Sequence, residues 1–568
     1  MRSNQVFQAT ITRHKAIEEL SSEGQPYALE FTQIRNQTQR VFVHAPATLH
    51  DLYAQSRSHK DFIIYADQRL SFDEVYLLAS ALARALVDDY GIQRGDRVAI
   101  AMRNYPEWTV AFLAATSIGA VCVSFNALWG APDMSFALQD CTPRAIIVDA
   151  ERLSKLCPPE SHDLRCRVIR VRAGNHPTVV SDDWDTVLMA KAGSPMPTCE
   201  VAPDDDATII YTSGTTGRPK GAVSTHRSII HALLSWELDA QVRALMGVYE
   251  APKLDHQDAM LLAVPLFHVS GSHVAMLASM RPQRKMVCMY KWDVELGLNL
   301  IEQERITVFT AAPAITQDLV RAAKTSARDL SSLQVMGGGG AHRAPEDVHG
   351  INQMMQSLTP HTGWGMTETN AIGAGIVGSD YLTYPASCGQ CSAVLDMRVV
   401  DTSGVSLESG ERGELQVRGT SMFNRYWNRP EADVNAFDGD WFRTGDAAII
   451  NTDGFVFIVD RIKDIVIRGG ENIACNAVEA ALVEHPLVIE ACVYGMPDER
   501  LGEEVGATIF ISAPIVEKEL EDFLFARLAK FEVPRHIDQT HSPLQRGASG
   551  KILRRAIKAD AITRFHKL

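Results

Sequence analysis

Short apolar strands alternate with helical segments along the first half of the chain, and this alternation limits the possible folds more than any other feature. The runs 98–102, 145–148, 208–211 and 261–264 have the length and apolar composition of buried strands. Strands that are buried on both faces belong to parallel sheets covered by helices. The sequence therefore predicts an α/β fold.

A capping box marks the start of one predicted helix. Ser71 and Glu74 are three residues apart, so each can satisfy a free backbone amide of the first turn. An apolar-rich helix over 75–87 follows, and Gly91 suits the left-handed residue that often ends a helix.

One uncharged stretch, 109–130, is long enough to cross a membrane. Polar residues and Gly119 interrupt it, however. We predict instead a buried helix to about residue 118, a turn at Gly119 and a buried strand over 121–125. We therefore expect no transmembrane segment, whereas peripheral membrane contact stays open.

The pattern changes after residue 397. The segments 398–400, 413–418 and 447–451 are short strand signals separated by Gly and Asp, which favours a small antiparallel barrel or sheet. Asp453-Gly454 lies between two apolar strands and predicts a hairpin. About 100 residues follow Asp460, enough for a small α+β domain. We place the boundary there, which gives domains 1–459 and 460–568.

Composition excludes several classes of protein. The 55 Lys and Arg residues against 69 Asp and Glu residues give a net charge of −14, which argues against a nucleic-acid binder but not against a nucleotide ligand. Ten scattered cysteines do not suggest a disulfide framework. Cys388 and Cys391 form a CxxC pair, but a tetrahedral zinc site needs a second pair, so we interpret them as ordinary thiols.

The two ends of the sequence suggest a compartment. The N-terminal 30 residues are polar and show no signal peptide, so we expect a cytoplasmic protein. The C-terminal His-Lys-Leu resembles a peroxisomal tripeptide only weakly, which leaves that compartment as the alternative. Oligomeric state stays open between monomer and homodimer.

The segment 211–221, Tyr-Thr-Ser-Gly-Thr-Thr-Gly-Arg-Pro-Lys-Gly, carries the strongest chemical signal. Its glycines allow backbone amides to turn inward around an anion, and its hydroxyl and cationic side chains supply further donors. It is not a Walker A loop, because Lys220 is not followed by Ser or Thr. The composition favours a polyphosphate site, and a surface turn is the alternative. The predicted nucleotide contacts here are Thr212, Ser213, Gly214, Thr215, Thr216, Gly217, Arg218, Pro219 and Lys220.

This segment resembles the signature loop of the adenylate-forming superfamily, which includes acyl-CoA synthetases, luciferases and the adenylation domains of peptide synthetases. Further matches follow in the family's order over about 340 residues. They are Pro-Leu-Phe-His at 265–268, Gly-Trp-Gly-Met-Thr-Glu at 363–368, Arg-Thr-Gly-Asp at 443–446, Asp-Arg-Ile-Lys-Asp at 460–464, Gly-Gly-Glu-Asn-Ile at 469–473 and Gly550-Lys551. The resemblance implies a large N-terminal domain of two α/β subdomains plus a small β-barrel, with a mobile α+β C-terminal domain.

The resemblance also implies roles for individual residues. Glu368 is the expected Mg²⁺ ligand, since hard cations prefer oxygen ligands, and Thr367 is expected beside phosphate. Lys551 is the expected catalytic cation, because a fixed ammonium stabilises charge at the attacked phosphorus. His268 completes the expected catalytic set, and Asp460 resembles the family's hinge.

The remaining expected contacts belong to adenine, ribose and coenzyme A. Trp364 stands where the family usually has Tyr, so base stacking is retained and the phenol oxygen is lost. Ala474 and Cys475 also depart from the family's pattern, next to the expected coenzyme A segment. The implied contacts are Gly340, Thr362, Gly363, Trp364, Gly365, Met366, Asp446 and Arg461 for the nucleotide, and Gly469, Gly470 and Glu471 for coenzyme A.

The expected acyl pocket carries no acid between Pro265 and Pro282. Burying a substrate ammonium there would be costly, so an apolar carboxylic acid is favoured over an amino acid. Ser272 occupies the place of a Trp gate found in long-chain relatives. Medium- or long-chain fatty acids are the first choice, and aryl or aryl-alkyl acids are the second.

The predicted function is an AMP-forming carboxylate–CoA ligase that uses ATP, Mg²⁺ and coenzyme A. The alternatives are an acyl-AMP former that loads a carrier protein, a luciferase-type oxygenase, and a non-catalytic nucleotide-binding scaffold. Retention of Lys551 argues against a scaffold, because a binding module does not need it.

Overall fold

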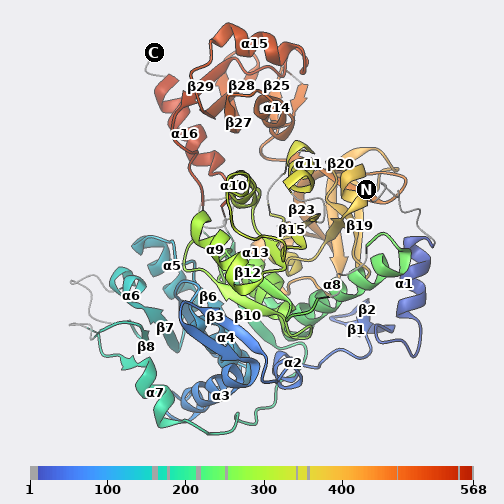
Figure 1. Ribbon diagram of the computed structural model, residues 1–568. Coiled ribbons are helices and arrows are strands. Elements are labelled where there is room, and N and C mark those ends of the chain that lie inside the picture. The colour runs from blue at the N-terminus through green and yellow to red at the C-terminus, as the bar shows by residue number, and fades with distance from the viewer. Residues whose placement is uncertain are drawn as a thin grey trace.

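Two large sheets form the body of the protein, and a smaller lobe of C-terminal residues stands above them (Figure 1). The structure is a computed structural model. It describes residues 11–156, 164–174, 179–212, 219–249, 254–340, 343, 345–354, 358–469, 471–547 and 550–565.

The first sheet has the strand order β21-β11-β10-β6-β5-β7-β8-β9. From β10 to β9 each strand is parallel to its neighbours, whereas β11 is antiparallel to β10 and β21 is antiparallel to β11. The parallel sheet predicted from the apolar runs is thus confirmed. Its strands are β5 (Arg97–Ala101), β6 (Val121–Ser124), β7 (Ala145–Asp149), β8 (Arg167–Val171), β9 (Asp182–Asp183), β10 (Asp206–Thr212), β11 (Lys220–Thr225) and β21 (Arg425–Tyr426).

Helix α3 (Phe72–Asp88) begins at the predicted capping box. The Glu74 amide donates to Ser71 Oγ over 3.1 Å, and the Ser71 amide donates to Glu74 Oε2 over 2.7 Å. Gly91 has a φ of +63°, which side chains adopt reluctantly. The helix ends at Asp88, one residue beyond the predicted end at 87, and Asp89 is its C-cap.

The long uncharged stretch folds as predicted. It forms the buried helix α4 (Pro106–Ser117), a turn at Gly119 with a φ of +72°, and strand β6. None of the helices in the described residues combines the length and apolar character that a membrane crossing requires.

The second sheet changes character along its width. Strands β3, β13, β12, β14, β15 and β16 are parallel, and from β16 onward every pairing is antiparallel, through β17, β18, β24, β23, β20 and β19. The parallel half consists of β3 (Asp61–Tyr65), β12 (Ala259–Leu262), β13 (Lys285–Cys288), β14 (Val308–Thr310), β15 (Val335–Gly337) and β16 (Thr359–Trp364), with β4 (Gln68–Ser71) on its edge.

The antiparallel region predicted after residue 397 is confirmed. Strand β24 of this region pairs with β18, which continues through β17 to β16 in the larger sheet. The strands of the region therefore lie close to the end of β16. The hairpin predicted at Asp453-Gly454 joins β23 to β24, with Gly454 at a φ of +79°. The antiparallel strands are β17 (Ala374–Val377), β18 (Gly389–Cys391), β19 (Leu395–Val400), β20 (Arg412–Gly419), β22 (Phe437–Asp438), β23 (Trp441–Ile450) and β24 (Phe455–Arg461).

One apolar cluster joins the two sheets. Side chains of α3, α4 and α8 (His226–Met246) pack in it with β5 from the first sheet and β12 from the second. The body therefore forms a single packed unit on which the site can be built. Its other helices are α1 (Arg13–Ser21), α2 (Leu49–Gln55), α5 (Ala131–Cys141), α6 (Ala150–Leu156), α7 (Trp184–Ala190), α9 (Val294–Glu304), α10 (Pro313–Ala323), α11 (Pro345–Met354), α12 (Ser379–Thr383) and α13 (Pro430–Ala436), with the short turns η1 (Ser270–Met276) and η2 (Leu277–Ser279).

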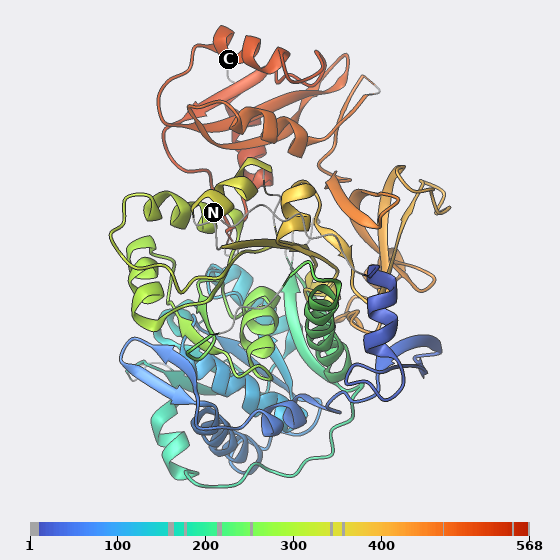
Figure 2. The same cartoon turned by 45° about the vertical axis from the view of Figure 1, so that its right-hand side comes forward.

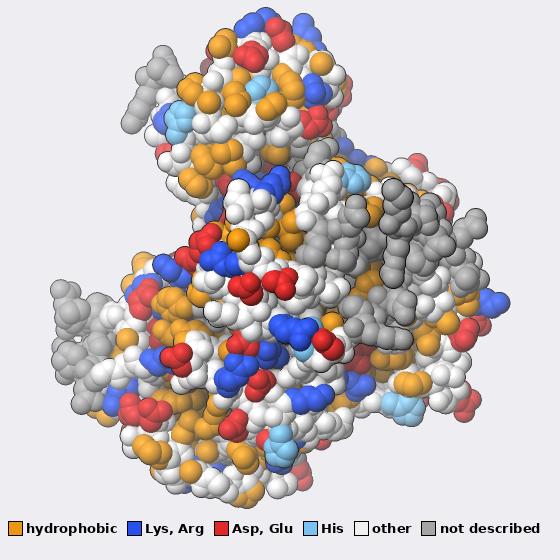
Figure 3. Space-filling model, in the orientation of Figure 1, with side chains coloured by type: hydrophobic (Ala, Val, Ile, Leu, Met, Phe, Trp, Pro, Cys, Tyr) orange, Lys and Arg blue, Asp and Glu red, His pale blue; other side chains and the backbone are white. Residues whose placement is uncertain are grey.

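The C-terminal lobe has its own apolar cluster and the predicted α+β composition. Figure 2 shows its helices lying over one sheet, and Figure 3 shows the lobe projecting from the body. Asp460, the predicted hinge and domain boundary, lies one residue before the end of β24. The elements of the lobe are β25 (Val466–Arg468), β26 (Glu471–Ile473), α14 (Cys475–Val483), β27 (Val488–Asp498), β28 (Gly502–Ile511), α15 (Glu517–Phe525), β29 (His536–Thr540) and α16 (Arg554–Phe565).

Buried histidines make the fold sensitive to acid. Burial lowers the pKa of His226, His231 and His273 to about 4. Nitrogens of the first two accept hydrogen bonds from backbone amides, which needs the neutral ring. Between pH 6.5 and 4 the unfolded chain therefore binds more protons than the folded one, so stability falls as the pH falls. We expect each histidine to contribute about 1.4 kcal/mol per pH unit in that window.

Urea denaturation at pH 7.5, 6.0 and 5.0 measures this loss. The control His59→Gln keeps the same pH dependence, because the His59 side chain is 99% exposed. A free energy of unfolding that stays constant or rises toward pH 5 would contradict the prediction.

Candidate active site

A cavity of about 1910 Å³ lies between the body and the C-terminal lobe. Its walls include the ends of β14–β16, helix α8, the β23–β24 pair and the segment that carries Lys551. Most of the residues predicted from the sequence lie on its surface. Those lining it are Thr212, Pro219, Lys220, His268, Gly340, Thr362, Gly363, Trp364, Gly365, Met366, Thr367, Glu368, Asp446, Arg461 and Lys551.

Other predicted residues lie elsewhere. Gly469 and Glu471 belong to the β25–β26 hairpin of the C-terminal lobe and are not among the described residues that line the cavity. The remaining predictions fall outside the residues that the structure describes. These are Ser213, Gly214, Thr215, Thr216, Gly217, Arg218 and Gly470.

Glu368 stands in the short turn η3 (Thr367–Thr369) and is only 6% exposed. The Tyr426 hydroxyl donates to its Oε1 over 2.8 Å. Lys220 Nζ lies 5.1 Å from the centroid of the Tyr426 ring. The Lys220 ammonium, the Tyr426 phenol and the Glu368 carboxylate are therefore spatial neighbours along one wall of the cavity.

Strand pairing explains why these groups meet. Tyr426 lies in β21 and pairs with Ala222 in β11, the strand that begins at Lys220. Burial and the nearby Glu368 carboxylate both raise the pKa of Tyr426, so its hydroxyl stays protonated as a donor. Sequence reasoning missed Tyr426, because nothing near it in the chain distinguishes it from a core aromatic residue.

Asp446 has an unusual pair of partners. Trp364 Nε1 donates to its Oδ2 over 2.8 Å, and Arg461 Nε lies 2.8 Å from its Oδ1. The register of β23 against β24 places Asp446 opposite Arg461. Burial raises the pKa of Asp446, whereas Arg461 lowers it. Trp364 thus offers an indole donor to Asp446 in place of the phenol that the family usually has.

Lys551 reaches from the C-terminal lobe to the body. A Cβ built on Gly340 would lie 3.4 Å from Lys551 Cε, so the lysine side chain crosses directly over this glycine. Gly340 has a φ of +88°, and a side chain there would be strained as well as crowded. The absence of a side chain at Gly340 therefore gives Lys551 access to the cavity.

The surroundings of Lys551 are mixed in charge. Its side chain is exposed, but it faces the cavity. The protein packed around it lowers the pKa of the ammonium, and Arg461 acts in the same direction, whereas Asp446 and Glu368 oppose the shift. Lys551 therefore lies within electrostatic reach of the predicted ribose residue and the predicted metal ligand.

A tight turn aims this lysine. The Gly547 amide donates to the Lys551 carbonyl over 2.8 Å, and the Gly550 amide donates to the Gly547 carbonyl over 3.0 Å. Gly550 has a φ of +79°. Arg546 Nη1 donates to the Gly550 carbonyl over 2.6 Å and so fixes the turn from its other side.

His268 lines the cavity, near the end of the β12–η1 connection. Burial lowers its pKa to about 4, and the Lys551 ammonium adds to the shift. The ring is therefore neutral near pH 7 and can donate or accept one hydrogen bond without adding charge. Ser272, at the predicted gate position, is fully buried and donates to the His268 carbonyl over 3.1 Å.

The acyl side of the cavity differs in part from expectation. Residues 265–282 contribute no acid, as the sequence requires, but helix α8 forms the opposite wall and brings Asp239 and Arg243 to it. The wall is therefore not free of charge. The sequence did not predict this, because α8 is distant in the chain from the pocket segment. Apolar lining comes from Met260, Val264, Val269, Val274, Ala278, Val308, Val335 and Ile372.

The Cys388–Cys391 pair behaves as predicted for ordinary thiols. Burial raises the pKa of both to about 12, and each contacts a backbone carbonyl. The described part of the chain contains no group of three or more His, Cys, Asp or Glu residues that is already arranged to hold a metal ion.

Comparison with known proteins agrees with this geometry. Residues 51–427 match the family described as AMP-binding enzyme, and residues 477–551 match the AMP-binding enzyme C-terminal domain. The chain is 31% identical to the long-chain-fatty-acid–CoA ligase FadD13 of Mycobacterium tuberculosis, over 87% of this chain and 93% of that protein. It is also 31% identical to a feruloyl-CoA synthase of Amycolatopsis sp., over 89% of this chain and 96% of that protein.

Solved structures give the same result. The o-succinylbenzoate CoA synthetase of Bacillus subtilis, in complex with its acyl-adenylate intermediate, has a TM-score of 0.76 at 25% identity, covering 90% of this chain and 98% of that one. A fatty acyl CoA synthetase of Mycobacterium tuberculosis has a TM-score of 0.68 at 27% identity, covering 91% and 99%. The chain therefore belongs to the family of AMP-binding enzymes, and these relatives, similar over most of its length, are CoA ligases.

Proposed function

We propose that the chain activates a carboxylic acid with ATP to acyl-AMP and pyrophosphate, and then transfers the acyl group to the thiol of coenzyme A with release of AMP. The enzyme class, an acid–thiol ligase, follows from the family and from the names of its relatives. The observation that best supports these two steps is the position of Lys551. It comes from a separate lobe, yet it enters the cavity that Glu368 and Asp446 also line.

Lys551 is the proposed catalytic residue of the first step. A substrate carboxylate and an α-phosphate are both anionic, and charge increases at phosphorus as the bond forms. An ammonium held between them lowers the repulsion and stabilises the transition state. Because its surroundings lower the pKa of Lys551, the rate of the first step is expected to fall, as the pH rises, at a lower pH than it would with a lysine in open water.

The residues at Glu368 fit a Mg²⁺ ion that arrives with ATP. Magnesium commonly binds through one or two carboxylates together with substrate phosphates and water, so a preassembled cluster is not needed. Glu368 would hold it, with Thr367 beside the phosphates, and it would neutralise charge on the phosphates. Tyr426 orients the Glu368 carboxylate through its hydrogen bond.

The second step requires a different arrangement of the lobe. Gly469 and Glu471, which we propose to contact coenzyme A, do not line the cavity while Lys551 does. We propose that rotation at Asp460 exchanges the two segments. Asp460 is buried and accepts hydrogen bonds from the Arg461 and Asn476 amides, so the pivot lies where the two domains meet.

The acid has a largely apolar body, as the lining from β12, β14 and η1 indicates. Medium- or long-chain fatty acids remain the first choice, with aryl acids second. The relatives' names include both kinds. Transfer to a carrier protein in place of coenzyme A is the alternative for the second step.

Release of pyrophosphate and of AMP tests the function. With ATP, Mg²⁺ and a panel of fatty and aryl acids, we expect pyrophosphate release with at least one acid, and AMP release that depends on added coenzyme A. Omission of Mg²⁺ should stop both. ATP binding without pyrophosphate release across the whole panel would indicate a non-catalytic scaffold.

A further inference from the structure

Arg243 is a charged residue of the cavity wall without a charged partner in direct contact among the residues that the structure describes. It lies in α8, seven residues after Trp236, which at 1.5 Å per residue is about 10 Å further along the helix axis. Its side chain lines the cavity. Within the described residues its guanidinium makes no hydrogen bond and no ion pair within 4 Å.

The acids near Arg243 do not pair with it directly. Asp239, one turn earlier in α8, is paired with Arg13 of α1 over 2.6 Å. Asp380 of α12 faces both arginines without a direct contact, and burial raises its pKa. Tyr249 is another titratable group nearby, and burial raises its pKa, so it stays neutral.

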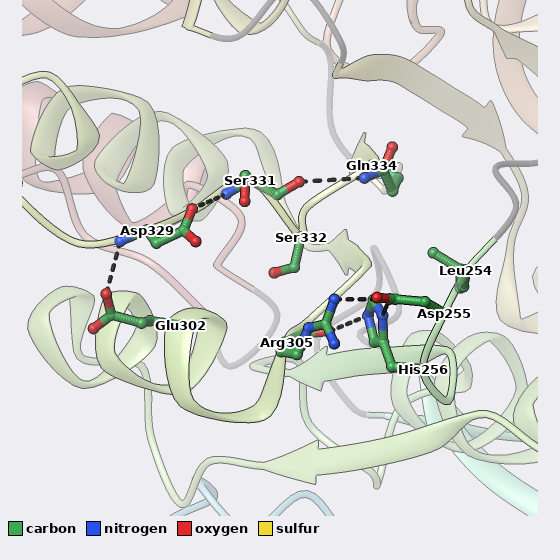
Figure 4. A pocket seen from close by; sticks show the side chains of 9 residues that line it. All are labelled: Leu254, Asp255, His256, Glu302, Arg305, Asp329, Ser331, Ser332 and Gln334. Atoms are coloured by element: carbon green, nitrogen blue, oxygen red, sulfur yellow. Dashed lines mark hydrogen bonds and ion pairs between the residues drawn. The ribbon is translucent and has the colours of Figure 1, made fainter.

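Two other arginines of the same cavity are paired, whereas Lys220, Arg343 and Lys551 show no ion pair within the described residues. Arg284 lies 2.6 Å from Asp258, and Arg461 lies 2.8 Å from Asp446. A smaller neighbouring pocket of about 240 Å³, which shares Leu254 and Gln334 with the cavity, likewise pairs its arginine, because Arg305 Nη2 lies 2.8 Å from Asp255 Oδ1 (Figure 4). Arg243 therefore contrasts with arginines whose charge is already satisfied.

Glycines leave room in front of Arg243. A Cβ built on Gly375 would lie 3.0 Å from Arg243 Nη2, so the guanidinium rests against β17 at a residue without a side chain. Gly375 pairs with Gly363 in the adjacent strand β16. The missing side chain at Gly375 makes room for the guanidinium between α8 and the sheet, and the missing side chain at Gly363 lets β16 lie close to the Ala374 carbonyl of β17.

The polar neighbour on the sheet is neutral. His361, two residues before Gly363 on the same face of β16, lines the cavity, and its Nε2 lies 3.1 Å from Thr310 Oγ1. Burial and the nearby arginines lower its pKa to about 4. It can donate or accept a hydrogen bond, but it does not balance the charge of Arg243.

A purely hydrocarbon tail suits this end of the pocket poorly. Filling the space would remove water from a guanidinium that stays protonated, and burying an unpaired charge is costly. An anionic group on the substrate would instead gain a charge-assisted hydrogen bond. The apolar lining between the nucleotide side and Arg243 suits the carbon skeleton that joins the two ends.

We propose that the acid activated by this enzyme carries a second anionic group at its far end, and that Arg243 binds this group. The proposal rests on the proposed function and specifies its substrate class. Arg243 is assigned a binding role only, since Lys551 is the proposed catalytic cation of the first step.

Length-matched acids test the proposal. Linear monocarboxylic acids and the dicarboxylic acids of the same carbon number, from four to twelve carbons, are compared by kcat/KM for pyrophosphate release. We expect the diacid to be preferred by about tenfold or more at one or more lengths, since a hydrogen bond to a charged group contributes about that much. A preference for the monoacid at every length would overturn the proposal without any variant.

Substitution of Arg243 assigns the preference to this residue. Arg243→Met keeps the length of the side chain and removes its charge, so we expect the diacid preference to disappear through a higher KM for the diacid, with monoacid turnover retained. Arg243→Lys should keep part of the preference, and Arg57→Met, in a surface ion pair with Asp73, should keep all of it. Equal losses with both acids in Arg243→Met would contradict a binding role.

The two proposals fail in different ways. Absence of pyrophosphate release with every acid would overturn the ligase function and the Arg243 proposal together. Release with monoacids, and no diacid preference, would overturn only the Arg243 proposal.

Discussion

Lys551→Ala is expected to slow acyl-AMP formation by about 10²- to 10³-fold and to leave thioester formation from preformed acyl-AMP nearly unchanged. The reason is positional. In this arrangement the lysine crosses Gly340 into the cavity, within electrostatic reach of Glu368 and Asp446. In the second step the thiol of coenzyme A attacks acyl-AMP, and AMP leaves with the phosphate. No cation therefore needs to be held between two anionic groups.

Two separate assays measure this division. Pyrophosphate release reports the first step, and AMP release from synthetic acyl-AMP and coenzyme A reports the second. Lys518→Ala is the matched control, because Lys518 lies on α15 of the same lobe and is paired with Asp522 on the surface. Equal loss of both steps in Lys551→Ala would show that the lysine supports the fold or both reactions, and not the first reaction alone.

Local signals in the sequence predicted the elements well. The capping box of Ser71 and Glu74 starts α3, because both hydrogen bonds form within one turn of chain. The uncharged stretch around Gly119 divides into helix, turn and strand, because glycine accepts the positive φ that the turn needs. Such features depend on neighbours in the chain and can be read from the sequence.

Long-range contacts in the site could not be predicted in this way. Tyr426 meets Glu368 because β21 pairs with β11, across more than 200 residues of chain. The indole of Trp364 reaches Asp446 because β23 joins the same sheet as β16 through β24, β18 and β17. The sequence indicated that Trp364 lacks a phenol oxygen, but only the fold shows which group its indole nitrogen binds.

Charge on the acyl wall illustrates the same limit. The absence of acids in 265–282 is visible in the sequence and correctly describes one wall of the pocket. The other wall is α8, whose exposed and buried faces are decided by packing against both sheets and α1. Arg243 could therefore be recognised as a pocket residue only once α8 was placed.

Arg554→Met is expected to lower the rate of acyl-AMP formation by about 10- to 100-fold. Arg554 follows Lys551 by three residues, at the start of α16. Its Nη1 lies 2.8 Å from Asp464 Oδ2, just after the hinge, and its Nη2 lies 2.8 Å from Glu479 Oε1 on α14. Asp460 Oδ1 is 3.8 Å from the same guanidinium. Arg554 therefore ties the lysine-bearing segment to the hinge, and we interpret it as a positioning residue.

Removal of this guanidinium leaves three acids without their shared cation. Burial already raises the pKa of Glu479, which Arg554 opposes, so the carboxyl would take up a proton more readily in the variant. Arg554, Asp464 and Glu479 are only partly buried, although Asp460 is buried, and we expect a loss of about 1–3 kcal/mol in the stability of the lobe, less than for a fully buried pair. A segment held less firmly places Lys551 less accurately, and small misplacements of a catalytic group reduce rates strongly.

Comparison of the two half-reactions distinguishes positioning from general loss of structure. At a temperature where the lobe remains folded, Arg554→Met should impair pyrophosphate release far more than thioester formation, because the contacts to Asp464 and Glu479 lie within the lobe and serve the lysine. Arg554→Lys should recover part of the rate, since one charge returns without the planar two-pronged contact. Arg555→Met, at the exposed neighbouring position, is the matched control. If the rates of both half-reactions fell in parallel, and the fall followed the melting of the lobe, the role of Arg554 would be purely structural.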